Sequence, residues 1–267
     1  MIKLIDIINI KNSLGESFDD DILNQIPVVP LSDIPTSAAK ASIGNGGNDD
    51  VVKSRKITLP AIRFRPAQRE LIVKKAVSIA INMILSDTIG GELGSVVSND
   101  KNPYIMDGHH RWAATILCDP KATITSIQFD LPGIQLVSVL NAITVGEFNR
   151  NGNDGFGNIR DFNSKNVGIV LNDLLENGTG DKYPKTPEEV EFALTKLGNG
   201  SPLNGIDIMT SNADLLPKNI MRDAPLRIDM PVIKDDEVDS VAHKFSIGHY
   251  DLTAPYSDEV KRELGLL

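Results

Sequence analysis

Residues 107–114 have the sequence DGHHRWAA and stand directly after a short apolar run, at the start of a segment with helical spacing. The glycine at position 108 permits a sharp backbone turn and the close approach of a ligand. We expect Asp107 to cap the helix by accepting a hydrogen bond from the amide of His109 or His110. This stretch therefore predicts a strand-to-helix junction, and the other elements are assigned outward from it.

The same junction has the composition of an anion site. The first amides of a helix lack partners within the helix, and the helix dipole favours negative charge beside them. Arg111 adds a planar guanidinium that suits phosphate oxygens, while His109 and His110 can donate or transfer protons. We expect Gly108 and Arg111 to bind phosphate and the two histidines to be catalytic. The alternative is structural: a capping aspartate, surface histidines, and Trp112 in the core.

The sequence on both sides of the junction predicts a mixed sheet with helices. Alternating and apolar runs are typical of strands, and apolar residues spaced three and four apart are typical of helices. Pro60 is expected at a sheet edge or a break. The expected elements are a strand at 56–62, a helix at 67–85, a β-hairpin from 94–98 and 104–106, a strand at 123–129 and a helix at 134–148.

The pattern changes after residue 148. Residues 149–158 are rich in Asn and Gly, which predicts a loop, and residues 164–176 have helical spacing. A capping box with proline at the first helical position starts at Thr186 and predicts a helix to about Leu197. Residues 198–233 contain four prolines and show no sustained period, and Ser257 is expected to cap a short helix.

These patterns predict an α/β fold, more closely an α+β mixed sheet. We expect an N-terminal arm and flexible linker at 1–55, a core domain at 56–148, and a mostly helical region at 149–267. The sequence indicates no oligomeric state.

Composition narrows the class of protein. The 267 residues carry a formal charge of −9 and a pI near 5.0, which argues against a protein that coats nucleic acid by charge alone. The single cysteine, Cys118, excludes an intrachain disulfide framework and lies in an apolar helix, where we expect it to be buried. No secretory signal and no apolar run of bilayer length is seen, so we expect a cytoplasmic protein without a membrane partner.

The total charge hides a basic segment at residues 53–75. It contains eight Lys and Arg residues against one acid, Glu70, a local charge of +7 that leaves −16 for the rest of the chain. We expect Arg65 and Arg69 to reach the same phosphates as Arg111, and Gln68 to bind the ligand or brace the loop. Glu70 is a candidate general base or metal ligand. A solvated helix face is the alternative interpretation of the segment.

Residues 107–114 resemble the signature of the ParB-like/sulfiredoxin superfamily, in its Asp-Gly-His-His-Arg variant. The stretch RPAQRE at 65–70 is similar to the Arg-Pro-Thr-Gln segment that opens the ParB-like domain of some members, with Ala67 where threonine is common. The expected order of elements also fits over residues 56–130. The resemblance implies a small α/β domain that binds the phosphates of a nucleotide at the signature helix.

The superfamily includes ParB clamps that bind and hydrolyse CTP, ATP-using sulfiredoxins, free-serine kinases and proteins labelled nucleases. Sulfiredoxins carry a nucleophilic cysteine just before the final His-Arg. That position is His109 here, so sulfiredoxin chemistry is not expected. The charge of −16 outside the basic segment argues against a partition protein that binds DNA.

Three functions follow as alternatives. The first is a nucleotide-dependent phosphotransferase or nucleotide hydrolase that uses ATP, ADP or CTP with Mg²⁺, as the resemblance implies. The second is a ParB-like nuclease acting on DNA or RNA, with His109 or His110 as acid or base. The third is a non-catalytic binding or scaffold module, compatible with a phage or mobile-element protein. The acceptor can be a small molecule or a nucleic acid.

Candidate metal ligands are few. Asp107 or Asp87 can hold a Mg²⁺ that arrives with the nucleotide. A zinc site would need His243 and His249, with Asp239 and Asp251 nearby, but their spacing does not match a tight ligand set.

Overall fold

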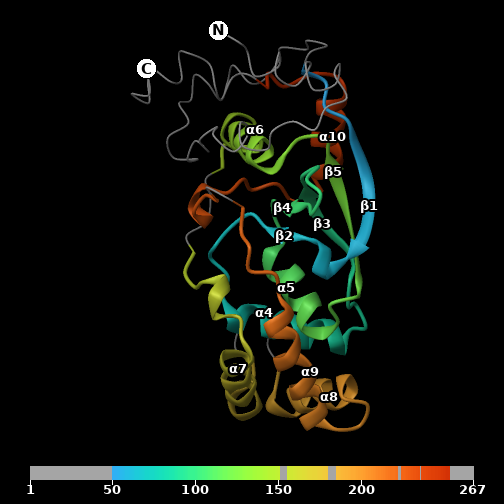
Figure 1. Cartoon of the computed structure of the whole chain (residues 1–267), viewed down its shortest axis with the longest axis vertical. Coiled ribbons are helices and arrows are strands. Elements are labelled where there is room, and N and C mark those ends of the chain that lie inside the picture. The colour runs from blue at the N-terminus through green and yellow to red at the C-terminus, as the bar shows by residue number, and fades with distance from the viewer. Residues whose placement is uncertain (1–49, 151–154, 180–184, 222–223, 235, 253–267) are drawn as a thin grey trace.

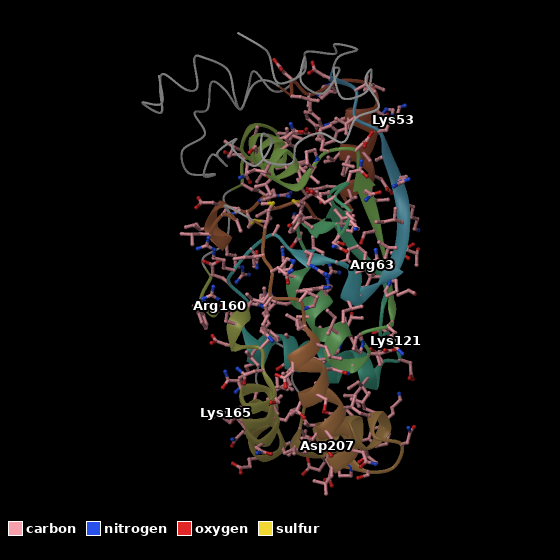
Figure 2. All side chains as sticks on the ribbon, in the orientation of Figure 1. Lys53, Arg63, Lys121, Arg160, Lys165 and Asp207 are labelled. Carbon is pink, nitrogen blue, oxygen red and sulfur yellow. The ribbon has the colours of Figure 1, made fainter. Side chains whose placement is uncertain are left out.

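The structure is a computed structural model, and it describes residues 50–150, 155–179, 185–221, 224–234 and 236–252. Figure 1 shows a mixed sheet with helices gathered at both ends of the long axis. The expected arm at 1–35, most of the linker and the helix expected after Ser257 lie outside the described residues. Charged side chains labelled in Figure 2, such as Lys121 and Lys165, project outward.

The sheet has five strands in the order β1-β5-β3-β4-β2. Strand β1 pairs antiparallel with β5, β5 runs parallel to β3, β3 and β4 form an antiparallel hairpin, and β2 runs parallel to β4. The α/β fold class is therefore confirmed, with parallel and antiparallel pairs in one sheet. The strand bounds are β1 Ser54–Pro60, β2 Arg65–Pro66, β3 Gly91–Val97, β4 Tyr104–Ile105 and β5 Thr123–Phe129.

Helices surround this sheet. The α-helices are α4 Val73–Leu85, α5 His109–Cys118, α6 Gly133–Gly146, α7 Ser164–Asn177, α8 Pro187–Leu197, α9 Pro202–Leu215 and α10 Val238–Ser246. Three short 3₁₀ helices are η3 Ala61–Arg63, η4 Ile159–Asp161 and η5 Arg227–Asp229. None of the helices in the described ranges is both long enough and apolar enough to cross a membrane.

Two hydrophobic clusters form the core, one on each face of the sheet. Adjacent residues of a strand point to opposite faces, so Val97 joins the first cluster and Val96 the second. The first cluster contains α4 and α5 and continues into α7, α8 and α9, while the second contains α6 and α10. Trp112 is fully buried in the first cluster, where its Nε1 donates to the carbonyl of Ala61 at 2.9 Å.

Cys118 is also buried in the first cluster, as expected. Its Sγ lies 3.7 Å from the carbonyl oxygen of Ala80, and burial raises the pKa of the thiol to about 12. The thiol is therefore neutral at physiological pH, which makes it a packing residue rather than a nucleophile.

Most of the expected elements are confirmed. The hairpin and the strand at 123–129 form as predicted, and β1 with Pro60 at its end is an edge strand of the sheet. The capping box is also present: Thr186 Oγ1 accepts from the N–H of Glu189 at 3.3 Å, and Glu189 Oε2 accepts from the N–H of Thr186 at 2.9 Å.

One expectation about helices is wrong. The helix expected at 67–85 begins only at Val73, because residues 65–66 join the sheet and histidine side chains hydrogen-bond the amides of Ala67 and Ile72. Residues 198–233 contain helix α9, although they lack a clear period. Ser201 caps this helix through the N–H of Asn204, and Pro202 occupies its first turn.

Candidate functional site

The first turn of α5 is built on a left-handed glycine. Gly108 is the N-cap residue, with φ +79° and ψ 15°, a conformation that favours residues without a Cβ. Asp107, which we expected to cap this helix, is therefore not its N-cap residue. Asp107 lies one residue earlier, and its Oδ1 accepts from the N–H of Gly108 at 2.6 Å.

Arg111 folds back over this turn. A Cβ placed on Gly108 would lie 3.7 Å from Nη2 and 3.8 Å from Nε of Arg111. The guanidinium therefore lies beside the backbone of the α5 N-terminus, where it adds positive charge to that of the helix dipole.

His109 is a buried hydrogen-bond acceptor. Its side chain is almost fully buried, and its Nε2 accepts from the backbone N–H of Ala67 at 3.1 Å. Burial, with the nearby charge of Arg227, lowers the pKa of His109 to about 3, against a smaller opposing effect from a hydrogen bond to the Ile105 backbone. The ring is thus neutral at physiological pH and engages the backbone on both sides.

His110 makes the equivalent contact one residue later. Its Nε2 accepts from the backbone N–H of Ile72 at 3.1 Å, and Ile72 is the N-cap residue of α4. Together the two histidines fix residues 67–72 against the first turn of α5. Both Nε2 atoms are acceptors here, so this geometry gives them a positioning role.

A cavity of about 200 Å³ opens at this junction. Three basic side chains from separate elements line it: Lys75 from α4, Arg111 from α5 and Arg227 from η5. The remaining described lining residues are Gln68, Ile79, Asp107, Gly108, His109 and His110. Six of the residues expected at the site therefore meet in one cavity, with the positive charge concentrated there.

Arg65 and Arg69 are not among the described lining residues. The Nη1 of Arg65 donates to the carbonyls of Ile62 and Phe64 at 2.9 and 2.8 Å, so its guanidinium braces η3. Arg69 is exposed, and its carbonyl accepts from the N–H of Ile159. The basic segment therefore contributes Lys75, rather than these two arginines, to the cavity.

Glu70 is not among the described lining residues, but it hydrogen-bonds two of them. Its Oε2 accepts from the backbone N–H of Arg227 at 3.2 Å, and its carbonyl accepts from Nε2 of Gln68 at 2.8 Å. It thus links two lining residues of the cavity, and it holds η5 against residues 67–72.

Arg227 is the site residue that sequence reasoning missed. It lies 157 residues from Glu70, in a segment without period or motif. Gly155 makes room for its stem, because a Cβ there would lie 2.4 Å from Cδ of Arg227. No local sequence signal marks this contact, which exists only in the folded chain.

Among the described residues, no three His, Cys, Asp or Glu side chains gather into a metal-binding group. Asp107 lines the cavity, whereas Asp87 forms an ion pair with Lys196 at 2.8 Å, in the part of the protein formed by α8. His249 packs edge-on against Tyr250, with ring centroids 5.2 Å apart. Asp107 is thus the one expected metal ligand that lines the described cavity.

Comparison with family models, with curated proteins and with solved structures found no match to this chain.

Proposed function

We propose that this protein binds a nucleotide through its phosphates at the cavity of α5, and that it catalyses phosphoryl transfer or nucleotide hydrolysis. The observation that carries the proposal is the convergence of Lys75, Arg111 and Arg227 on the N-terminus of one helix. Phosphoryl transfer depends mainly on positioning and on neutralising charge, which these groups supply.

The size of the cavity supports phosphate groups as its occupants. Sites for whole small molecules usually have volumes of about 300–1,000 Å³, whereas this cavity has about 200 Å³. We expect the phosphates to occupy it and the nucleoside to extend beyond it. The resemblance of residues 107–114 to the ParB-like/sulfiredoxin signature supports the same assignment.

A Mg²⁺ ion fits this arrangement. Mg²⁺ is usually held by one or two carboxylates together with substrate phosphates, and Asp107 offers a carboxylate at the cavity wall. When bound, the ion would neutralise phosphate charge. Lys75, Arg111 and Arg227 would orient the phosphates, while His109, His110 and Glu70 would keep the wall in place.

The nuclease alternative fits the charge distribution less well. A nuclease needs a surface that follows a polynucleotide backbone, and such surfaces are strongly basic. Here three basic groups meet in one small cavity of an acidic chain. This distribution suits a nucleotide better than a duplex.

Thermal unfolding in the presence of ATP, ADP, CTP or GTP, with and without Mg²⁺, tests the proposal. A ligand at 100 times its dissociation constant should stabilise the native state by about 2.7 kcal/mol. Lys75→Ala should abolish the shift and Lys121→Ala, an exposed lysine outside the cavity, should retain it. Release of phosphate or transfer to an acceptor is then measured with the nucleotide that binds. No shift with any nucleotide would favour the scaffold alternative.

A further inference from the structure

A second cavity, of about 340 Å³, lies where β1 begins and β5 ends. Asn99 follows β3 by two residues and Asp130 follows β5 directly, so the cavity lies beyond the carboxyl ends of two adjacent parallel strands. Open α/β sheets commonly bind ligands at this edge. Its described lining residues are Lys53, Ser54, Arg55, Asn99, Gln128 and Asp130, none of which lines the α5 cavity.

A buried glutamine holds the guanidinium of Arg55 in this cavity. Gln128 is 5% exposed, its Oε1 accepts from Nε of Arg55 at 2.8 Å, and its Nε2 donates to the carbonyl of Ser98 at 3.0 Å. Both ends of the amide are therefore engaged, which fixes the plane of the arginine. Within the described residues, the two Nη atoms of Arg55 have no hydrogen-bond partner. They form a fork that matches a carboxylate or phosphate.

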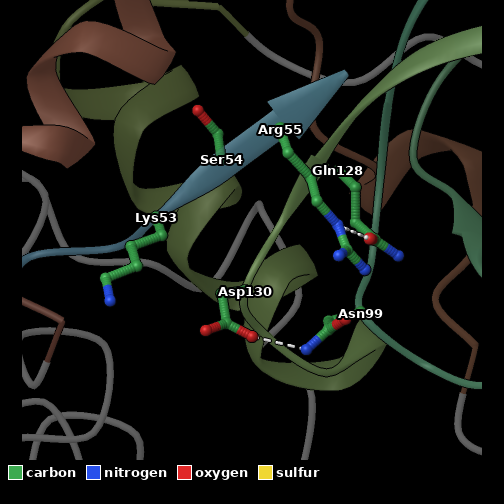
Figure 3. A pocket seen from close by; sticks show the side chains of 6 residues that line it. All are labelled: Lys53, Ser54, Arg55, Asn99, Gln128 and Asp130. Atoms are coloured by element: carbon green, nitrogen blue, oxygen red, sulfur yellow. Dashed lines mark hydrogen bonds between the residues drawn. The ribbon is translucent and has the colours of Figure 1, made fainter. Parts of the chain in front are cut away.

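An acidic group lines the same cavity. Asp130 accepts a hydrogen bond from Nδ2 of Asn99, and its backbone N–H donates to the carbonyl of Lys53 at 2.9 Å. Figure 3 shows the Arg55 guanidinium on one side of the cavity, the Asn99–Asp130 pair opposite it and Lys53 at the side. The described wall thus offers one cationic fork, Arg55, and one carboxylate acceptor, whereas the ammonium group of Lys53 points away from Arg55 (Figure 3).

We propose that this cavity is a second ligand site, which takes a small organic carboxylate that also carries a hydroxyl or ammonium group. The carboxylate pairs with Arg55, and the hydroxyl or ammonium group donates to Asp130. A phosphate dianion fits less well, because it would place two negative charges beside the Asp130 carboxylate. This inference is independent of the nucleotide site at α5.

Three probes of equal backbone size separate these contributions: glycine carries an ammonium group, glycolate a hydroxyl group, and acetate neither. Each is titrated into the ¹⁵N-labelled full chain at constant pH and ionic strength, with inorganic phosphate as a fourth probe. The readout is the side-chain amide signal of Gln128, which is local to this cavity. We expect glycine or glycolate to bind saturably, and acetate to bind about tenfold more weakly.

Variants make the assignment specific. Arg55→Gln should abolish the saturable shift. Asp130→Asn should make the affinity for acetate similar to the affinity for glycine or glycolate. Lys121→Gln should leave both the saturable shift and the difference in affinity unchanged. Arg111→Ala should also leave the titration unchanged, which separates this site from the α5 cavity. The proposal is overturned by the absence of saturation with every probe, by saturation that persists in Arg55→Gln, or by phosphate binding more tightly than the three carboxylates.

Discussion

The Nε2 atom of His110 accepts a hydrogen bond from the backbone N–H of Ile72 at 3.1 Å, and this contact joins the first turns of two helices. Ile72 is the N-cap of α4, which carries Lys75, and His110 lies in the turn of α5 that carries Arg111. The contact therefore sets the spacing between two basic groups of the cavity. It explains the paired histidines without assigning them proton transfer.

Removing this acceptor should destabilise the fold. His110→Ala leaves the Ile72 N–H without its side-chain partner, which should lower the free energy of unfolding by about 1–3 kcal/mol. His110→Gln keeps a side-chain acceptor and should recover part of the loss. Urea denaturation measures both variants. Unchanged stability in His110→Ala, together with lost turnover, would instead indicate a catalytic histidine.

His109 should make stability depend on pH. Its pKa is about 3 in the folded chain and near 6.5 when unfolded, so the unfolded state binds more protons between these values. The contribution of the neutral ring is therefore complete above pH 6.5 and is lost as pH falls toward 3. By linkage, the loss should reach about 2 kcal/mol at pH 5.

The control is His109→Gln, which removes the titrating ring and keeps the carboxylates of the chain. The difference in unfolding free energy between wild type and this variant should shrink from pH 7 to pH 5. A difference that stays constant across this range would show that His109 is not held neutral by burial.

Local patterns predicted most of the sheet and misplaced one helix start. The strand at 123–129 and the hairpin follow from alternation within a few residues, which a sequence displays directly. The start of α4 does not follow from local patterns. It depends on hydrogen bonds that the side chains of His109 and His110 accept from backbone amides about 40 residues away in the chain. Tertiary contacts there override the helical spacing of residues 67–72.

The residues of the candidate site were also predictable only in part. Gly108 and Arg111 belong to one motif and were predicted from it, and Gln68 belongs to the adjacent basic segment. Arg227 reaches the cavity only because Glu70 binds its backbone N–H and Gly155 leaves space for its stem. Neither contact has a signature in a single sequence, so the third basic group was not predictable.

Gly108 should resist substitution for a conformational reason. A Cβ at this position would make only ordinary contacts, the nearest at 3.7 Å, but φ of +79° strains any residue that has one. Gly108→Ala should therefore cost about 1–2 kcal/mol of stability. Gly168→Ala is the matched control, because Gly168 lies within α7 in a helical conformation, with its nearest neighbour atom also at 3.7 Å.

In that control the substitution should raise the stability instead of lowering it, since alanine is favoured over glycine in a helix interior by about 0.5–1 kcal/mol. Thermal or urea unfolding of the two variants gives the comparison. Equal effects at both positions would contradict the role of the left-handed turn at Gly108.

The central claim is that Arg111 holds nucleotide phosphates at the start of α5, and isothermal titration calorimetry with ATP and CTP in the presence of Mg²⁺ tests it most directly. Arg111→Ala removes a charge-assisted contact and should weaken binding by about 1.5–3 kcal/mol, or about 10- to 150-fold. Lys121→Ala should bind as the wild type does. An unchanged affinity for both nucleotides in folded Arg111→Ala would contradict the assignment of this site.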